Sequence, residues 1–93
     1  MPYKVRGIPS FWAVVDDTAD RYILQDLYDI CFRMVESGPT QPGSQPTRLY
    51  LPPVTFPGWF LDLPGEGAFI RYCELTAERI LLVNFIAYDW DDA

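Results

Sequence analysis

Few residues in this 93-residue sequence have the chemistry of a catalytic or metal site. The chain contains no histidine, so it cannot assemble a Ser-His-Asp or Cys-His nucleophile system. Its two cysteines, Cys31 and Cys73, are far apart and have apolar neighbours, and a zinc site would need carboxylates beside them. Two cysteines are also too few for a disulfide scaffold. We therefore expect buried, reduced thiols, no metal and no cofactor.

Charge is the second chemical feature of the sequence. Thirteen acidic residues face seven basic ones, for a net charge of −6 at pH 7. Proteins that bind nucleic acid regardless of its sequence do so through Lys and Arg side chains that neutralise phosphates. The excess of acidic residues therefore excludes general coating of nucleic acid, but it does not exclude local contact. The carboxylates gather between Asp16 and Asp29 and again between Asp89 and Asp92. A basic partner segment would suit these faces, although an acidic helix is most often only a solvated face.

The N-terminal half reads as a short strand followed by helix. Residues Tyr3 to Ile8 alternate in a strand-like pattern that ends at Pro9. Ser10 is then a plausible N-cap for a helical stretch from Phe11 to Val15, and Asp16 to Thr18 offer either a break or a second cap. A helical hairpin and one bent helix fit equally well.

The clearest helix of the sequence runs from Ala19 to Glu36. Its apolar residues recur at helical spacing, at Ile23, Leu27, Ile30, Cys31 and Met34. It ends at Gly38 and Pro39, because glycine suits the residue after a helix and proline prevents its continuation. The run from Pro39 to Thr47 holds three prolines and a glycine, which predicts an extended surface loop.

The C-terminal half reads as antiparallel sheet. Arg48 to Leu51 and Val54 to Leu63 are strand material interrupted by prolines, and Ala68 to Leu75 and Arg79 to Tyr88 form the best hairpin, around Thr76 to Glu78. We predict one α+β domain over residues 1–93: a short N-terminal strand, the helical part, then a three- to four-stranded antiparallel sheet. The last hairpin should be central, covered by helices on one side and open to another chain on the other.

The sequence also predicts a cytoplasmic location. No apolar run approaches the length of about 20 residues that crosses a bilayer. The N-terminus lacks the apolar region of a secretory signal. We therefore expect no membrane partner.

The order of elements and the last two strands carry a family resemblance. In Gly67 to Leu75, followed by Glu78 to Tyr88, an arginine and a tyrosine precede a short turn and a very apolar final strand. The pattern resembles the paired end strands of the RelE/ParE superfamily, the toxins of bacterial type II toxin–antitoxin systems. The resemblance implies a toxin neutralised by a cognate antitoxin. RelE-like members cut messenger RNA on the ribosome, whereas ParE-like members poison DNA gyrase.

The resemblance also implies site residues. Arg71 would hold the phosphate, Arg48 would add a second cation, and Tyr88 would match the C-terminal tyrosine that moves a proton. Each has an ordinary alternative: Arg71 as the partner of a nearby carboxylate, and Tyr88 as a cap on the core. The chain departs from the family because no lysine follows Lys4 and the middle strands lack a cationic cluster. Endoribonuclease activity therefore stays open.

Two classes of function follow from the sequence. One is a toxin of this type, and the other is a non-enzymatic acidic interaction module or a degenerate adaptor of the same fold. Cations gathered around Arg71, Arg48 and Arg6 would favour the toxin, and a continuous carboxylate surface there would favour the module. So many large aromatics in a short chain also predict an exposed apolar surface for a partner or a homodimer, with Trp12 among the candidate anchors.

Overall fold

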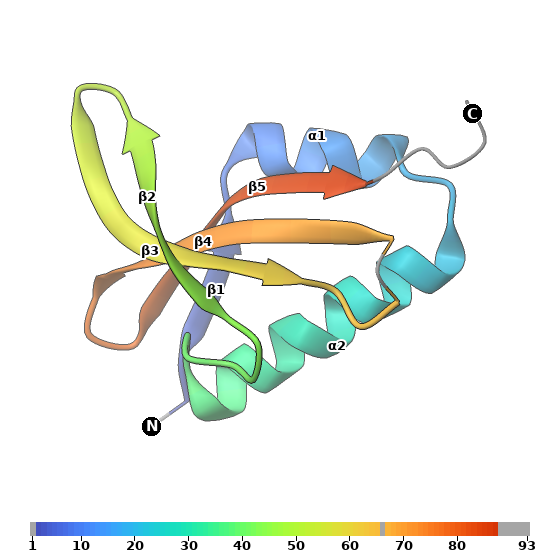
Figure 1. Ribbon diagram of the computed structural model, residues 1–93, viewed down its shortest axis with the longest axis horizontal. Helices are drawn as coiled ribbons and strands as arrows, with labels where there is room; N and C mark the ends of the chain where they lie inside the picture. Colours follow the sequence, from blue (N-terminus) through green and yellow to red (C-terminus); the bar gives the residue numbers. More distant parts are fainter. Residues whose placement is uncertain (1, 66, 88–93) are drawn as a thin grey trace.

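A computed structural model describes residues 2–65 and 67–87 as one sheet with helices on one of its faces (Figure 1). The elements in chain order are β1 Lys4–Gly7, α1 Pro9–Asp17, α2 Arg21–Ser37, β2 Gln45–Leu51, β3 Val54–Asp62, β4 Ala68–Thr76 and β5 Arg79–Ala87. The α+β class is therefore confirmed. Within these residues, neither helix has the length and apolar character needed to pass through a bilayer.

The sheet has five strands in the order β1-β5-β4-β3-β2. β1 runs parallel to β5, from the pair Lys4 and Arg79 to the pair Gly7 and Leu82, and every other neighbouring pair is antiparallel. The strand count differs from the expected three to four, because β1 joins the antiparallel strands β2 to β5 as a fifth, parallel strand. Local sequence shows that a segment is extended, but it does not show which strand will lie beside it. The central place of the β4–β5 hairpin is confirmed.

The two helices are separate, because α1 ends at Asp17 and α2 begins at Arg21 with an N-cap of its own. Ser10 does not cap α1 as expected: the helix starts at Pro9, whose fixed φ and missing N–H suit the first helical position, after extended Ile8. α2 starts after Asp20, whose carboxylate accepts hydrogen bonds from the backbone N–H of Tyr22 (2.9 Å) and Ile23 (3.3 Å). The chain thus forms two distinct helices, with a short break between them.

α2 ends as predicted, and the segment after it differs from the expected surface loop. Gly38 has φ +89°, and its N–H donates to the Met34 carbonyl. Pro39 and Gln41 are buried, and the Gln41 amide donates to the Gly38 carbonyl at 2.7 Å. β2 then begins at Gln45, earlier than expected. The segment is a packed connection because its backbone and side chains satisfy one another.

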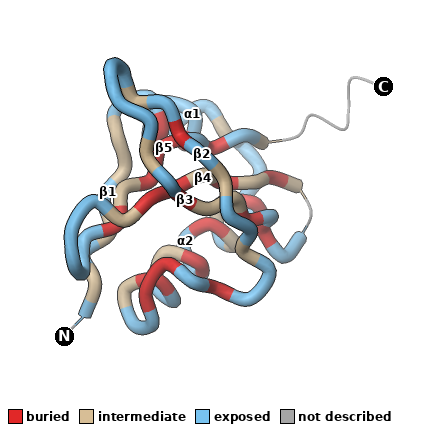
Figure 2. Tube along the Cα trace, turned by 60° about the vertical axis from the view of Figure 1, so that its left-hand side comes forward, coloured by how far each residue is buried: buried red, intermediate tan, exposed pale blue. Residues whose placement is uncertain are grey.

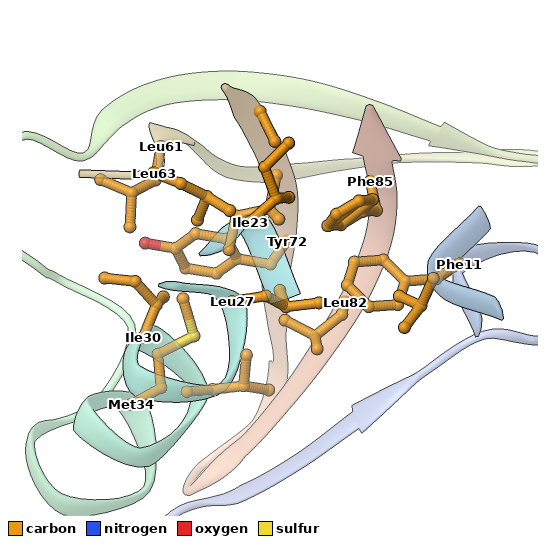
Figure 3. Close-up of a cluster of buried hydrophobic side chains, with 14 residues drawn as sticks. Phe11, Ile23, Leu27, Ile30, Met34, Leu61, Leu63, Tyr72, Leu82 and Phe85 are labelled. Carbon is orange, nitrogen blue, oxygen red and sulfur yellow. The ribbon is translucent and has the colours of Figure 1, made fainter. Parts of the chain in front are cut away.

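The main core lies between the helices and one face of the sheet (Figure 3). Figure 2 shows the buried positions concentrated along α2 and the central strands. Tyr72 of β4 sits at the centre of this core: it is fully buried and stacks on Trp59 with ring centroids 5.8 Å apart. Its hydroxyl donates to the Pro39 carbonyl at 2.6 Å. Tyr72 therefore ties the sheet to the segment that leaves α2.

Neither of the two described helices covers the opposite face of the sheet, and β2 curls toward it. β3 pairs with β2 along its length, but with β4 only from Trp59 to Asp62. Gly58 marks the bend, since a Cβ there would collide with the Tyr72 carbonyl oxygen. The bend lets Leu49 of β2 pack with Cys73 and Val83 in a small second cluster. We call this side of the sheet the open face; the β2–β3 hairpin projects beyond it as an arm (Figure 1).

Tyr72 gives a prediction for stability at alkaline pH. Burial raises the pKa of its phenol from 10.0 to about 12, against a smaller lowering by the Ser44 hydroxyl. The neutral form therefore stabilises the folded protein fully below pH 10, and this contribution is lost as pH rises toward 12. Tyr72→Phe removes that part of the alkaline loss. At pH 7 it removes one of the two hydrogen bonds that the Pro39 carbonyl accepts, the other coming from the Gln41 N–H (3.1 Å), at a cost of about 0.5–1.5 kcal/mol.

Urea denaturation of the two proteins at pH 7 and at several values above pH 10 measures both effects. Tyr50→Phe is the matched control, because Tyr50 is 67% exposed. Equal free energies of unfolding for wild type and Tyr72→Phe at pH 7 would contradict the role assigned to the hydroxyl.

Candidate functional sites

An apolar groove of about 190 Å³ lies between α1 and α2, above β1. We call it the helix groove. Its lining residues come from both helices and from the sheet beneath them: Val5, Trp12, Tyr28, Cys31, Phe32, Val35 and Leu82. The groove is formed because α2 carries two apolar stripes. One faces the core, and the other, Tyr28, Phe32 and Val35 at i, i+4 and i+7, lies about 120° round the helix.

The aromatic residues of the helix groove are exposed. Phe32 is 71% exposed, Tyr28 49% and Trp12 37%. Trp12 is held in place by close packing: it meets Phe11 edge to face at 5.2 Å, and a Cβ on Gly7 would lie 2.7 Å from its indole nitrogen. Large apolar side chains that gather on one exposed surface mark binding sites more often than single exposed residues do. The exposure of Trp12 favours an interface, as the sequence analysis anticipated.

Cys31 contributes to the floor of the helix groove. Its thiol is free, and burial raises its pKa from 9.0 to about 11. The thiol is therefore uncharged at neutral pH, which makes it an apolar surface and a poor nucleophile. Cys73 is also free and is buried as expected, whereas Cys31 is only half-buried.

Three carboxylates on the two helices lie beside the helix groove, and we call them its rim. Asp16 lies one turn after Trp12 on the same side of α1, and Asp29 and Glu36 lie one turn to either side of Phe32 on α2. All three are exposed. Arg33 is also exposed, but it lies 100° round the helix from Phe32, away from the groove. An apolar strip bounded by carboxylates suits a partner that is apolar along one side and basic beside it.

Arg71 lies on the open face in β4, beside Phe69. Its guanidinium carbon is 5.8 Å from the centroid of the Phe69 ring. The Nε atom is buried and has no hydrogen-bond partner within residues 2–65 and 67–87. No ion pair joins Arg71 to Asp62 or Glu74 in this part of the chain. Arg71 therefore does not form the expected ion pair with Asp62 or Glu74.

Arg71 and Arg48 lie on opposite faces of the sheet. Arg71 is paired with Phe60 of β3, and Phe60 with Gln45 of β2, so these three side chains share the open face. Arg48 is an odd number of residues from Gln45 along β2 and points the other way. Tyr88 lies outside the described residues. Among the residues described, the site implied by the resemblance is thus not brought together.

Asn84 lies beside Arg71, whereas Arg6 does not join Arg71 and Arg48. Asn84 is exposed beside Arg71, next to an irregularity in the pairing of β4 with β5, so burial of this side chain among the strands is not observed. Arg6 lies in edge strand β1, and its neighbours there are Lys4 and Arg79 rather than Arg71 and Arg48. Within the described ranges, no group of three or more Cys, Asp or Glu side chains could hold a metal ion.

Of the residues that line the helix groove, sequence analysis singled out Trp12 as a candidate anchor but missed the exposed apolar stripe of α2. The apolar residues of α2 that face the core are enough to predict the helix, so the second apolar stripe was not needed for that prediction and was not interpreted. The available signal was the spacing of Tyr28, Phe32 and Val35, three apolar residues on a side of the helix that the core does not use.

No protein-family model matches the chain, and no curated protein or solved structure shows significant similarity to it.

The state of Cys31 gives a prediction about its reactivity. In a Cys73→Ala background, alkylation of Cys31 by iodoacetamide should be slow at pH 7.5 and accelerate about tenfold per pH unit up to its pKa, because only the thiolate attacks. Mass spectrometry of timed samples measures the rate, with free cysteine as the reference. Rapid alkylation at neutral pH would contradict both the raised pKa and the apolar floor.

Proposed function

We propose that this protein is a non-enzymatic binding module that holds a basic amphipathic helix of a partner protein in the helix groove. The observation that carries the proposal is the exposed aromatic strip of Trp12, Tyr28 and Phe32 between two helices. Val5 and Cys31 of the floor pack on the core and Trp12 packs on Phe11, so these residues need little ordering when a partner binds.

The form of the groove favours a helix as its occupant. An amphipathic helix places apolar side chains at i, i+3, i+4 and i+7, which fills a groove between two antiparallel elements with one continuous ridge. Trp12 and Phe32 would flank that ridge, above the floor made by Val5 and Cys31. Burying one such aromatic ring contributes about 1.5–3 kcal/mol.

The rim gives the partner its charge. Asp16, Asp29 and Glu36 would meet Lys or Arg side chains that flank the apolar ridge of the partner. The same carboxylates oppose a second copy of this chain, which has a net charge of −6 and brings an identical acidic rim. We therefore favour a different protein over the homodimer.

A synthetic 18-residue peptide with leucine at i, i+3, i+4 and i+7 of each two turns and lysine at the other positions, labelled for fluorescence anisotropy, tests the proposal. We expect it to bind the wild type at least tenfold more tightly than Phe32→Ser, because the Phe32 ring is buried on binding. Tyr22→Ser is the matched control and should bind like the wild type, since Tyr22 is 84% exposed and lies off the groove side of α2.

The same peptide with glutamate in place of lysine should not bind. Equal binding to the Phe32→Ser and Tyr22→Ser variants would contradict the helix groove as the site. Equal binding of the basic and acidic peptides would contradict the role of the rim.

A second candidate function rests on Arg71. We propose as the alternative a toxin component of a type II toxin–antitoxin module that acts on messenger RNA or DNA gyrase, with the antitoxin in the helix groove. What supports it is the buried Nε of Arg71, for which residues 2–65 and 67–87 provide no acceptor, because a buried unsatisfied donor calls for a partner. A phosphate oxygen would supply that acceptor.

Expression in a bacterial host without an antitoxin tests this alternative. An RNA-cleaving toxin should arrest growth and degrade messenger RNA, and Arg71→Ala should reduce cleavage at least a hundredfold, as expected when one donor is lost from a charge-stabilising site. Arg33→Ala is the control, on the exposed side of α2. Arrest with intact messenger RNA would indicate gyrase as the target, and normal growth of all three strains would contradict the toxin.

A further inference from the structure

We propose that the hollow beside β1 on the open face is a binding site for a small phosphomonoester. The hollow has a volume of about 250 Å³. It is lined by three cations and three apolar residues: Lys4, Arg6, Leu75, Arg79, Ile80 and Leu81. The site is separate from the helix groove, which lies on the other face of β1, so this inference does not rest on the function proposed above.

The strand pairing brings the three cations together. Lys4 and Arg6 are two residues apart on β1, so their side chains point to the same face. Arg79 is the direct neighbour of Lys4 in the parallel pair, and Leu81 is the direct neighbour of Arg6. Adjacent strands are about 4.8 Å apart, which sets three positive charges around one hollow at the sheet edge.

Such a cluster needs an anion. Like charges directly opposite one another destabilise a sheet. The chain has only seven cations against thirteen carboxylates, yet no carboxylate of residues 2–65 and 67–87 lines this hollow. Glu78 lines the adjoining hollow, together with Pro2, Ala77 and two of the same cations, Lys4 and Arg79. No ion pair neutralises Lys4, Arg6 or Arg79 within the described part of the chain.

The shape and the apolar residues restrict the ligand. A dianionic phosphate can accept hydrogen bonds from two arginines and a lysine at once, whereas a carboxylate has fewer oxygens to share. Leu75 is 47% exposed and, with Leu81, offers an apolar surface to the body of the ligand. Single-stranded nucleic acid needs aromatic stacking platforms along a basic track, and none of the aromatic residues that the structure describes lines this hollow. A small organic phosphate fits better than a polynucleotide.

Titration of the ¹⁵N-labelled full chain with phenyl phosphate tests the proposal by NMR. We expect saturable shifts of the amides of Lys4, Arg6, Arg79 and Leu81, with weaker binding of inorganic phosphate, which cannot contact the leucines. Lys4→Gln and Arg6→Gln should each weaken phenyl phosphate about tenfold, because each removes a charge-assisted hydrogen bond.

Two further variants separate a built site from general charge effects. Arg48→Gln removes an exposed arginine at the opposite edge of the sheet and should leave the affinity within twofold. Glu78→Gln should tighten binding, because it removes the carboxylate of the adjoining hollow.

Chemical shifts that do not saturate, or an equal loss of affinity for phenyl phosphate in Arg48→Gln and Arg6→Gln, would contradict a built site. Either result would indicate a general effect of charge. Tighter binding of a single-stranded oligonucleotide than of phenyl phosphate would overturn the small ligand. Equal affinity for inorganic phosphate and phenyl phosphate would overturn the part assigned to Leu75 and Leu81.

Discussion

The parallel pairing of β1 with β5 is the constraint on which the rest of the structure depends. The N–H of Lys4 donates to the Glu78 carbonyl (2.7 Å) and the N–H of Ile8 to the Leu82 carbonyl (3.1 Å), so the first strand is fixed beside the last. The helices that follow β1 then pack on one face of the sheet, while the other face stays open. A slip of one residue would expose Val5 and bury Lys4 and Arg6 among the helices. The register of this four-residue strand thus places the helix groove on one face and the cationic hollow on the other.

Local signals in the sequence were enough to predict the elements that pack against segments next to them in the chain. The β4–β5 hairpin and the end of α2 at Gly38 follow from turn residues and periodicity. The partner of β1 could not be found in this way, because it lies some 75 residues further along the chain. The start of β2 was hidden by Pro46, which an edge strand tolerates because only one side of it is hydrogen-bonded.

The candidate sites were harder to predict than the elements, for the same reason. Arg71 was placed correctly on a strand, but its separation from Arg48 depends on the registers of two strand pairs. The three-cation hollow depends on the β1–β5 register, which the sequence does not reveal. The apolar spacing of Tyr28, Phe32 and Val35 can be read from the sequence, but only the fold decides whether another element covers it. Spacing indicates which residues share a face, and tertiary structure decides what lies opposite that face.

Charge explains how a small protein can keep an uncovered aromatic groove. An exposed strip that contains Trp12, Tyr28 and Phe32 favours self-association, because two copies could bury their strips together. The carboxylates at Asp16, Asp29 and Glu36 oppose that arrangement, since they would face identical carboxylates across the contact. The same three carboxylates would attract a basic partner, so they disfavour the homodimer and favour the proposed complex. In the proposed binding module, the excess of carboxylates that argues against nucleic acid would also select a basic partner.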